Sequence, residues 1–297
     1  MFDTTPTLDC AGRSLKLDRP RICGVLNLTS DSFSGDGLRD DMQAAVARGV
    51  AMVEQGADLL DVGGESTRPG AQEVLCADQI ARVVPVIEAL VRAVEVPISI
   101  DTSKPDVMRA AIAAGAGMIN DVYALRRDGA LDAAAELGVP VCLMHMQGEP
   151  RTMQDAPHYD DVVADVHRFL AERLFACQMA GIDKKRILID PGFGFGKTLE
   201  HNLALLRGLE RFAELAPVMV GLSRKATIGT LTGRERPADR AAGSAAAALI
   251  AVQRGAMIVR VHDVAITRDA LAVWQAVGNS VKPRLNPAAK NTLWDDD

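Results

Sequence analysis

The chain has 297 residues, of which 48% are hydrophobic and only 4% aromatic, and its formal net charge is -6. A chain of this length can bury about three quarters of the surface that its unfolded form exposes, so it can build a sizeable core from aliphatic side chains. The negative charge argues against a broad surface for nucleic acid or anionic membranes, because both require an excess of Lys and Arg.

Cysteine usage and hydropathy predict a cytoplasmic location. The five cysteines are scattered without a Cys-x-x-Cys pair or a zinc-ligand spacing, which is typical of free thiols in a reducing compartment. Residues 1–13 lack the basic start and apolar core of an export signal. The longest apolar stretch without a charge, between Arg240 and Arg254, is too short and too rich in alanine to span a bilayer.

Eight short apolar runs each stop at a polar residue or a glycine-rich turn. In chain order they are I-C-G-V-L-N, D-L-L-D-V-G-G, P-I-S-I-D, M-I-N-D, V-C-L-M-H, I-L-I-D-P-G, V-M-V-G-L-S-R-K and M-I-V-R-V-H. Continuous apolar strands are typical of a parallel sheet that is buried on both faces. Segments with helical periodicity alternate with the runs, at residues 41–55, 74–94, 105–114, 129–137, 159–180, 199–215, 238–254 and 264–277.

Eight alternating strands and helices predict an α/β fold, a single (β/α)8 TIM barrel whose active site lies at the carboxyl ends of the strands. Residues 1–20 are expected to form a short N-terminal hairpin or plug, residues 21–281 the catalytic barrel, and residues 282–297 a flexible tail. Long polar stretches at residues 28–40, 63–75 and 223–239 are candidate lids over that rim.

Carboxylates and amides end several of the predicted strands; they are Asn27, Asp61, Asp101, Asn120, Asp121 and Asp190. Aspartate accepts hydrogen bonds and asparagine both donates and accepts, so the group is suited to a flat heterocycle with several polar edges. For any single aspartate, the alternative is a structural cap on the next helix, and both interpretations stay open.

Cationic candidates follow the last two runs. Lys225 lies in S-R-K, and Arg260 and His262 are two residues apart on a strand, so they share one face. These barrels commonly bind phosphate after the last two strands. A solvent-exposed surface position is a weak alternative for Arg260, because it interrupts an apolar run where it would be buried without a partner.

The glycine-rich segment after Asp190 is not a nucleotide-binding loop, because Pro191 stands where that motif needs its first glycine. We expect its glycines to let the backbone approach a bound ring while Phe193 or Phe195 stacks on it.

His145 is one histidine where a zinc hydrolase barrel would have a pair or more, so zinc chemistry is not favoured. An all-oxygen Mg²⁺ site near Asn27 and the Asp31/Asp36 loop, shared with a diphosphate, stays open.

The motifs together resemble those of the dihydropteroate synthase family, over about residues 20–280. They are N-L-T-S-D-S-F-S-G-D-G, D-V-G-G-E-S-T-R-P-G, I-D-T-S-K-P, I-N-D, M-H-M-Q-G, D-P-G-F-G-F-G-K, G-L-S-R-K and R-V-H-D. The resemblance implies a transferase of folate biosynthesis that joins 6-hydroxymethyl-7,8-dihydropterin diphosphate to 4-aminobenzoate, giving 7,8-dihydropteroate and pyrophosphate. It also implies a homodimer, Mg²⁺ as cofactor and sulfonamides as inhibitors.

The resemblance assigns roles residue by residue. It places the pterin against Asp101, Asn120, Met144, Asp190, Phe195, Gly221 and Lys225. It places the diphosphate against Asn27, Arg68, Arg260 and His262, with Mg²⁺ on Asn27. It places 4-aminobenzoate against Phe33, Thr67, Arg68, Pro69, Ser223 and Ala226. The groups it makes catalytic are Asp101, Lys225, Arg260 and His262.

The implied chemistry is a dissociative substitution in which charge stabilisation does most of the work. No cysteine or serine has the base partner that covalent catalysis requires. One departure from the family pattern is Ala226, where many members have a serine thought to contact the aminobenzoate carboxylate. We therefore expect weaker aminobenzoate binding, although Thr227 or a helix beginning within residues 224–231 offers other donors.

Two other functions fit a pterin pocket: a pterin-binding methyltransferase barrel and a non-catalytic pterin carrier. Neither releases a diphosphate. The cations of S-R-K and R-V-H, together with the complete T-S-D-S-F-S and E-S-T-R-P-G loops, favour the synthase.

Overall fold

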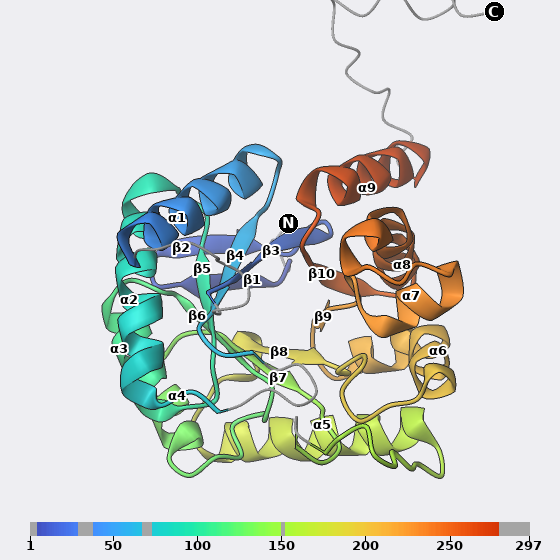
Figure 1. The fold of residues 1–297 in the computed structure, drawn as a ribbon. Helices are drawn as coiled ribbons and strands as arrows, with labels where there is room; N and C mark the ends of the chain where they lie inside the picture. Colours follow the sequence, from blue (N-terminus) through green and yellow to red (C-terminus); the bar gives the residue numbers. More distant parts are fainter. Residues whose placement is uncertain (1–4, 29–37, 67–72, 150–151, 279–297) are drawn as a thin grey trace, which may run out of the picture.

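Eight parallel strands form a closed barrel that helices surround (Figure 1). The computed structural model describes residues 5–28, 38–66, 73–149 and 152–278 of the chain. The barrel strands are β3 (Arg21–Asn27), β4 (Leu59–Gly63), β5 (Ile98–Asp101), β6 (Met118–Asp121), β7 (Val141–Met144), β8 (Ile187–Asp190), β9 (Val218–Val220) and β10 (Ala256–Val261). They pair in chain order and β10 closes on β3, which confirms the predicted TIM barrel.

Helices follow the strands along the chain. They are α1 (Leu38–Glu54), α2 (Cys76–Ala93), α3 (Pro105–Ala113), α4 (Ala130–Leu137), α5 (Val162–Met179), α6 (Leu199–Arg207), α7 (Ala226–Thr232), α8 (Ala241–Gln253) and α9 (Val264–Gly278), with the 3-10 helices η2 (Lys184–Arg186), η3 (Leu209–Glu214) and η4 (Pro237–Arg240). Local signals start several of them. Pro105 occupies the first turn of α3, and the Asp161 side chain accepts hydrogen bonds from the first turn of α5.

Two predicted segments differ from the structure. The helix expected over residues 199–215 is interrupted: α6 ends at Arg207, and the chain continues after Gly208 as η3. Glycine has a low helix propensity because its backbone loses the most freedom on ordering, so a helix end there is favourable. The long polar loop expected at residues 223–239 contains α7 and η4, so it is largely helical.

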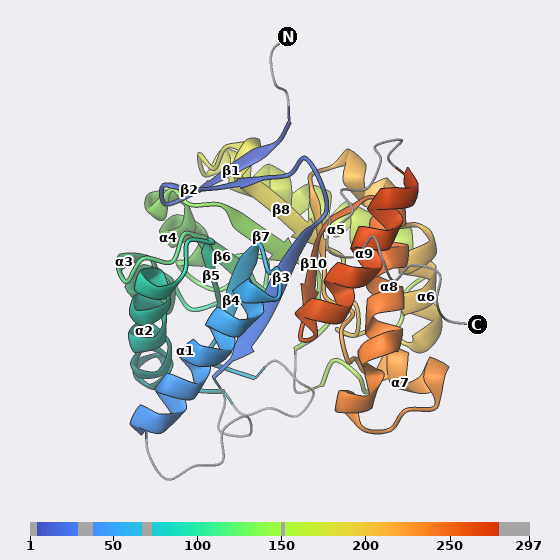
Figure 2. The ribbon, with the colours of Figure 1, turned by 90° about the horizontal axis from the view of Figure 1, so that it is seen from above.

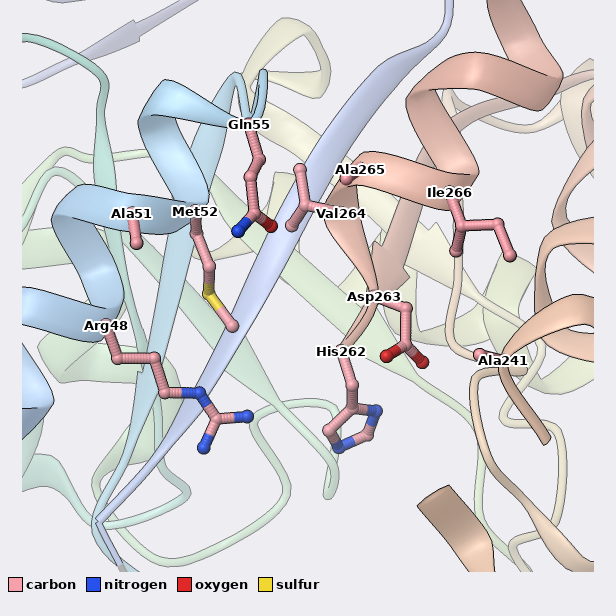
Figure 3. A pocket seen from close by; sticks show the side chains of 10 residues that line it. All are labelled: Arg48, Ala51, Met52, Gln55, Ala241, His262, Asp263, Val264, Ala265 and Ile266. Atoms are coloured by element: carbon pink, nitrogen blue, oxygen red, sulfur yellow. The ribbon is translucent and has the colours of Figure 1, made fainter. Parts of the chain in front are cut away.

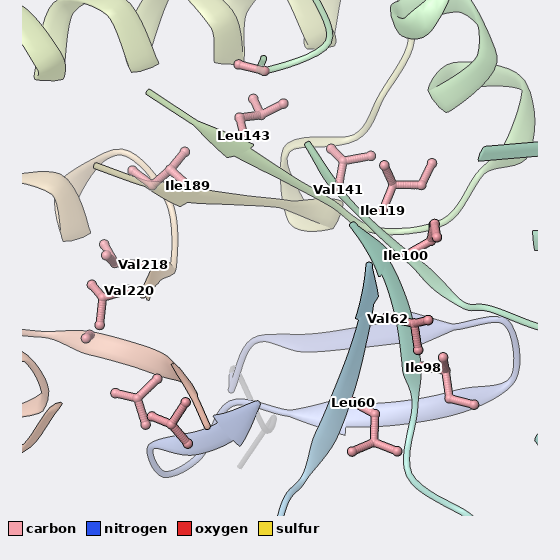
Figure 4. Close-up of a cluster of buried hydrophobic side chains, with 14 of the residues drawn as sticks. Leu60, Val62, Ile98, Ile100, Ile119, Val141, Leu143, Ile189, Val218 and Val220 are labelled. Carbon is pink, nitrogen blue, oxygen red and sulfur yellow. The ribbon is translucent and has the colours of Figure 1, made fainter. Parts of the chain in front are cut away.

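The strands are continuously apolar because both of their faces are buried. Figure 4 shows side chains such as Val62, Ile100, Ile119 and Leu143, which belong to the large cluster between the sheet and its helices. The alternate positions of the same strands point into the barrel, since side chains alternate along a strand. The polar residues described below occupy these inward positions.

An antiparallel hairpin closes the amino end of the barrel, as predicted. It consists of β1 (Thr7–Cys10) and β2 (Arg13–Lys16), and Figure 2 shows it where the barrel strands begin. Its apolar face packs against inward-facing residues of the strands; this cluster contains Leu8, Cys10, Leu15, Leu17, Cys23, Leu59, Met118, Cys142, Leu188, Met219 and Ile258. The inner surface available to a ligand is therefore at the carboxyl end.

Within the described ranges, no helix is long and apolar enough to cross a membrane. The proposed C-terminal tail, residues 282–297, and the barrel boundary at residue 281 lie outside the described residues.

Candidate active site

Inward-facing polar side chains gather toward the carboxyl end of the barrel. Strand register places Asp101 beside Asn120 and Asp61 beside Ser99. Asn120 and Asp190 are almost fully buried, each with 5% of its surface exposed. The barrel thus has an apolar, plugged end and a polar end.

Arg260 forms ion pairs with two of these carboxylates, so the expectation that it would be buried without a partner is wrong. Its Nε donates to Asp61 Oδ2 at 2.6 Å, and its terminal nitrogen donates to Asp101 Oδ2 at 2.8 Å. Closure of the barrel between β10 and β3 brings these residues together. Burial raises the pKa of Asp101 to about 7, while Arg260 opposes this shift and Asp61 adds to it.

Asp61 has a role that the sequence analysis did not assign. It holds Arg260 and also accepts a hydrogen bond from Asn120 Nδ2 at 3.0 Å, so it orients two candidate ligand-binding groups. Asp61 lies two residues before the end of β4, so the two positions share the inward face of the strand. This spacing was the signal in the sequence that Asp61 faces the site. Asp121 shows the structural alternative instead, because its carboxylate accepts the backbone N–H groups of Tyr123 and Leu125, both at 2.8 Å.

Lys225 lies between Asp190 and an aromatic ring. Its Nζ is 4.6 Å from the centroid of the Phe195 ring and donates to the Phe193 carbonyl. Burial lowers the pKa of Lys225 to about 8, although Asp190 favours the charged form. Gly221 lies beside this side chain: a Cβ there would be 3.8 Å from Lys225 Nζ, an ordinary contact distance.

The turn that presents Lys225 depends on a second ion pair that was not predicted. Arg224 has a left-handed backbone (φ 60°), and its guanidinium binds Asp263 with two hydrogen bonds, one of them 2.9 Å long. Its backbone N–H donates to Ser244 Oγ at 2.9 Å. Arg224 is thereby held on Asp263 while the next residue, Lys225, reaches Phe193 and Phe195. The aspartate of R-V-H-D was the only sequence signal for this pair.

Two glycines after β8 make room for neighbouring backbone, a reason that the sequence did not indicate; their approach to a bound ring stays a prediction. A Cβ on Gly192 would lie 1.8 Å from the His145 carbonyl oxygen, and one on Gly196 would lie 2.4 Å from that of Gln147. Both glycines also have positive φ angles, 72° and 62°.

The two phenylalanines of this loop differ. Phe193 is fully buried in the main core and is not available to stack on a ligand. Phe195 is partly buried and packs with Met144, Met146 and Met153 in a small cluster. Met144 and Phe195 therefore belong to one apolar cluster, and Phe195 lies beside Lys225; their contact with a pterin stays a prediction.

His262 is neutral rather than cationic in the structure. Burial and the nearby Arg260 lower its pKa to about 3. Its Nδ1 lies 3.1 Å from Ser223 Oγ, and its backbone N–H donates to the same oxygen at 3.2 Å. Ser223 is thus linked to His262, at the predicted diphosphate end of the site.

A cavity of about 440 Å³ lies beside His262, between α1 and the start of α9 (Figure 3). Arg48 from α1 and Asp263 also line it. Burial and the charge of Arg224 lower the pKa of Arg48, and the carboxylate of Asp263 opposes this shift.

Comparison with known proteins identifies the family of this chain. The model of the family described as pterin binding enzyme matches residues 23–262. The dihydropteroate synthase of Escherichia coli (strain K12) is 51% identical over 266 residues, which cover 89% of this chain and 94% of that protein. The chain belongs to the dihydropteroate synthase family.

Solved structures of dihydropteroate synthases share the fold. The Xanthomonas albilineans enzyme with 4-aminobenzoic acid is 63% identical, with a TM-score of 0.89 over 94% of this chain and 100% of that one. The Yersinia pestis enzyme in a sulfonamide drug complex is 46% identical, with a TM-score of 0.87 over 92% and 99% of the two chains. The segment matched by the family model includes each candidate residue of the described part, from Asn27 to His262.

Four residues that the family resemblance assigns lie outside the described residues: Phe33, Thr67, Arg68 and Pro69, as does the Asp31/Asp36 loop. Ala226, the departure from the dihydropteroate synthase pattern, is exposed and begins α7, with Lys225 as the preceding cap residue. His145, whose role the sequence analysis left open, is buried with its Nδ1 2.9 Å from Lys197 Nζ.

Proposed function

We propose that this chain is a dihydropteroate synthase, which condenses 6-hydroxymethyl-7,8-dihydropterin diphosphate with 4-aminobenzoate and releases pyrophosphate. The observation that carries the proposal is the arrangement of charges at one end of the barrel. Buried carboxylates and an amide (Asp101, Asn120, Asp190) lie next to Lys225 and Arg260. Such a site offers hydrogen bonds to a heterocycle and positive charge to a leaving anion.

At the heterocycle end, Asp190 and Asn120 hydrogen-bond the polar edge of the pterin. Asp190 Oδ1 accepts the Gly192 N–H at 2.7 Å, which orients the carboxylate and leaves its other oxygen for a ligand donor. Asn120 uses its NH2 group on Asp61, so its carbonyl oxygen remains an acceptor. Met144 and Phe195 supply apolar contact to the ring faces.

The reaction breaks the bond between the exocyclic CH2 and the diphosphate oxygen, and the electron pair leaves with the diphosphate. Lys225 and Arg260 stabilise the negative charge of the leaving group, and Asp101 stabilises the cation left on the pterin. The amine of 4-aminobenzoate then forms the new C–N bond and loses a proton. Arg260 is pre-oriented for this role because two carboxylates hold it.

The other end of the diphosphate lies by Asn27 and His262. His262 uses Nδ1 on Ser223, so Nε2 remains for a phosphate oxygen. Ser223 and Ala226 are the described part of the 4-aminobenzoate site, together with Phe33, Thr67, Arg68 and Pro69. We assign Arg68 to both that site and the diphosphate.

The residues present fit a Mg²⁺ ion shared with substrate. Asn27 ends β3 at the rim, and a Cβ on Gly63 would lie 3.4 Å from Asn27 Oδ1 and 3.8 Å from Asp101 Oδ2, so glycine leaves space there. Within the described residues, no group of three His, Cys, Asp or Glu side chains is arranged to hold a metal. Mg²⁺ commonly takes one or two protein oxygens with phosphate oxygens and water, which suits Asn27. When bound, the ion neutralises charge on the diphosphate.

The assembly and location follow the same proposal: a homodimer in the cytoplasm, inhibited by sulfonamides. Ala245, Ala247 and Ala248 at the centre of α8 are buried within the chain. Large apolar side chains are exposed on α8 and α9; they are Ile250, Ile266, Val273 and Val277. Such a group on adjacent helices supports a protein interface. A light-scattering mass of one chain, 31.6 kDa, at micromolar concentration would contradict the dimer.

The test is pyrophosphate release when both substrates are mixed with the protein and Mg²⁺. We expect release that needs 4-aminobenzoate and falls on chelation of the metal. Asp101→Asn should lower kcat by about a hundredfold, because the developing cation loses its carboxylate. Asp160→Asn, at a carboxylate whose side chain is 99% exposed, is the matched control.

A methyltransferase or a pterin carrier would bind the pterin without releasing pyrophosphate. Absence of release would therefore overturn the proposed function. If Asp101→Asn and Arg260→Ala both release pyrophosphate at the unmodified rate, the roles assigned to these residues are wrong.

A further inference from the structure

Lys197 is a buried lysine that the proposed reaction does not use. It follows the glycine loop after β8 and precedes α6, with only 3% of its surface exposed. A buried ammonium is costly unless its donors are satisfied, so its retention inside the protein needs a physical reason. Packing alone is not that reason, since an apolar side chain of similar length would fill the same space.

The three donors of Lys197 all bind the loops after β7 and β8. Nζ is 2.9 Å from His145 Nδ1, 3.0 Å from the Phe195 carbonyl oxygen and 3.4 Å from the His145 carbonyl oxygen. Burial lowers the pKa of His145 to about 2, so its ring is neutral and Nδ1 accepts the ammonium proton. His145 in turn donates its backbone N–H to the Asp190 carbonyl at 2.9 Å.

Each carbonyl of the loop from Phe193 to Gly196 accepts a hydrogen bond from a side chain. Lys225 binds the first carbonyl, and Gln154 Nε2 binds the second at 2.6 Å. Lys197 binds the third, and the Tyr159 hydroxyl binds the fourth at 2.8 Å. Two lysines therefore bind alternate carbonyls of the loop that carries Phe195. Lys225 binds the Phe193 carbonyl, and Lys197 binds the Phe195 carbonyl.

Lys197 also acts on Asp190 through space. Burial lowers the pKa of Lys197 well below its usual value, and the charge of Asp190 opposes this shift by favouring the ammonium form. Among the described residues, no carboxylate forms an ion pair with Lys197. The groups that act on Asp190 are Lys225 after β9, Lys197 and the Gly192 N–H after β8, and Arg260 on β10; Cys142 on β7 also lies near it. Burial raises the pKa of Asp190, and the three cations oppose that shift.

We propose that Lys197 is a positioning residue for the pterin end of the site: its hydrogen bonds fix the loop that carries Phe195, and its protonated form adds a third positive charge near Asp190, in addition to those of Lys225 and Arg260. Lys197 touches no substrate. It acts through the Phe195 carbonyl, His145 and the carboxylate of Asp190. This inference rests on the proposed function, because it assumes that Asp190 binds the pterin as a carboxylate.

The test uses the full chain with Lys197→Met, and Lys185→Met as control. Lys185 is an exposed lysine of η2 at the opposite end of β8. We expect Lys197→Met to fold but to lose some stability, because Met fills the same space and leaves the acceptors of His145 and Phe195 without a donor. Circular dichroism and the thermal midpoint check this.

Binding of the pterin diphosphate alone, measured by calorimetry, should weaken about tenfold in Lys197→Met. The KM for 4-aminobenzoate at saturating pterin diphosphate should stay within about twofold. Removing a cation raises the pKa of Asp190, and binding is lost as pH falls through that pKa. The acid limb of pterin binding should therefore move to higher pH in Lys197→Met, and Lys197→Arg, which keeps the charge, should restore it.

A double-mutant cycle with Asp190→Asn separates this role from a general loss of structure. If Lys197 acts on Asp190, its substitution should cost several-fold less affinity when the carboxylate is already absent. Additive effects, or wild-type pterin affinity and pH dependence in Lys197→Met, would overturn the inference while leaving the proposed function intact. If the unmodified chain neither binds pterin diphosphate nor releases pyrophosphate, both fall.

Discussion

At the residue scale, the charge of Lys225 near neutral pH depends on the groups around it. Burial and Arg260 disfavour its ammonium form, while Asp190 and Asp101 favour it, and the balance leaves the pKa of Lys225 at about 8. At neutral pH the ammonium form therefore predominates, but the margin is small. A free lysine, in contrast, stays charged to above pH 10.

The activity should accordingly have a basic limb. The charged form of Lys225 stabilises the leaving group, so kcat/KM for the pterin diphosphate should fall as pH rises through about 8. Lys225→Arg stays charged throughout this range, so its basic limb should disappear even though its larger head lowers the rate at neutral pH. A basic limb at the same pH in both proteins would show that another group titrates.

The ion-pair partners of Arg260 could not be predicted from the sequence. An arginine inside an apolar run indicated an anion site, but its structural partners, Asp61 and Asp101, are 199 and 159 residues away along the chain. Only closure of β10 onto β3 brings them into contact. The neutral state of His262 was equally unpredictable, because it follows from burial beside Arg260.

At the scale of elements, the start of helix α7 determines how residue 226 lies relative to Lys225. Its first residue, Ala226, is exposed, and the left-handed Arg224 two residues earlier turns the chain so that Lys225 reaches the Phe193 carbonyl. A hydroxyl at residue 226 would project from the same rim as Lys225.

Ala226→Ser should therefore lower the KM for 4-aminobenzoate, by about twofold to tenfold, which corresponds to one added hydrogen bond. The KM for the pterin diphosphate should not change, since residue 226 is not among the residues assigned to that substrate. Steady-state kinetics with each substrate varied in turn measures both. An unchanged KM for 4-aminobenzoate would mean that residue 226 does not reach its carboxylate.

Strands and most helices were predictable because their signals are local. Runs such as I-L-I-D and I-S-I-D carry their own pattern, and Pro105 and Asp161 start helices through contacts within one turn. The backbone contacts of the glycine loop could not be predicted because they are not local. Gly192 and Gly196 approach carbonyls of the preceding strand's loop, and those contacts exist only when β7 and β8 are adjacent.

At the scale of the whole molecule, the barrel has two ends with different composition. The amino end is sealed by the hairpin and lined by aliphatic and sulfur-containing side chains. The carboxyl end carries the ion pairs of Arg260 and the buried Asp190. Substitutions that destabilise the amino end should therefore leave the chemistry at the carboxyl end unchanged.

Gly117 tests this separation. It begins the segment that enters β6, and a Cβ there would lie 2.2 Å from the Cys10 carbonyl oxygen of the hairpin. Backbone cannot give way as a side chain can, so Gly117→Ala should push the hairpin from the barrel and lower the free energy of unfolding by about 1–3 kcal/mol. Gly278→Ala is the control, because a Cβ there would lie in open space and alanine favours helix α9.

Urea denaturation measures the stability of both variants, and pyrophosphate release well below the thermal midpoint measures their function. We expect Gly117→Ala to lose stability while its KM values for both substrates stay at the unmodified level, because the hairpin contacts none of the candidate binding residues. Gly278→Ala should keep both properties. Raised KM values in a folded Gly117→Ala protein would show instead that the plug and the binding rim are coupled through the barrel interior.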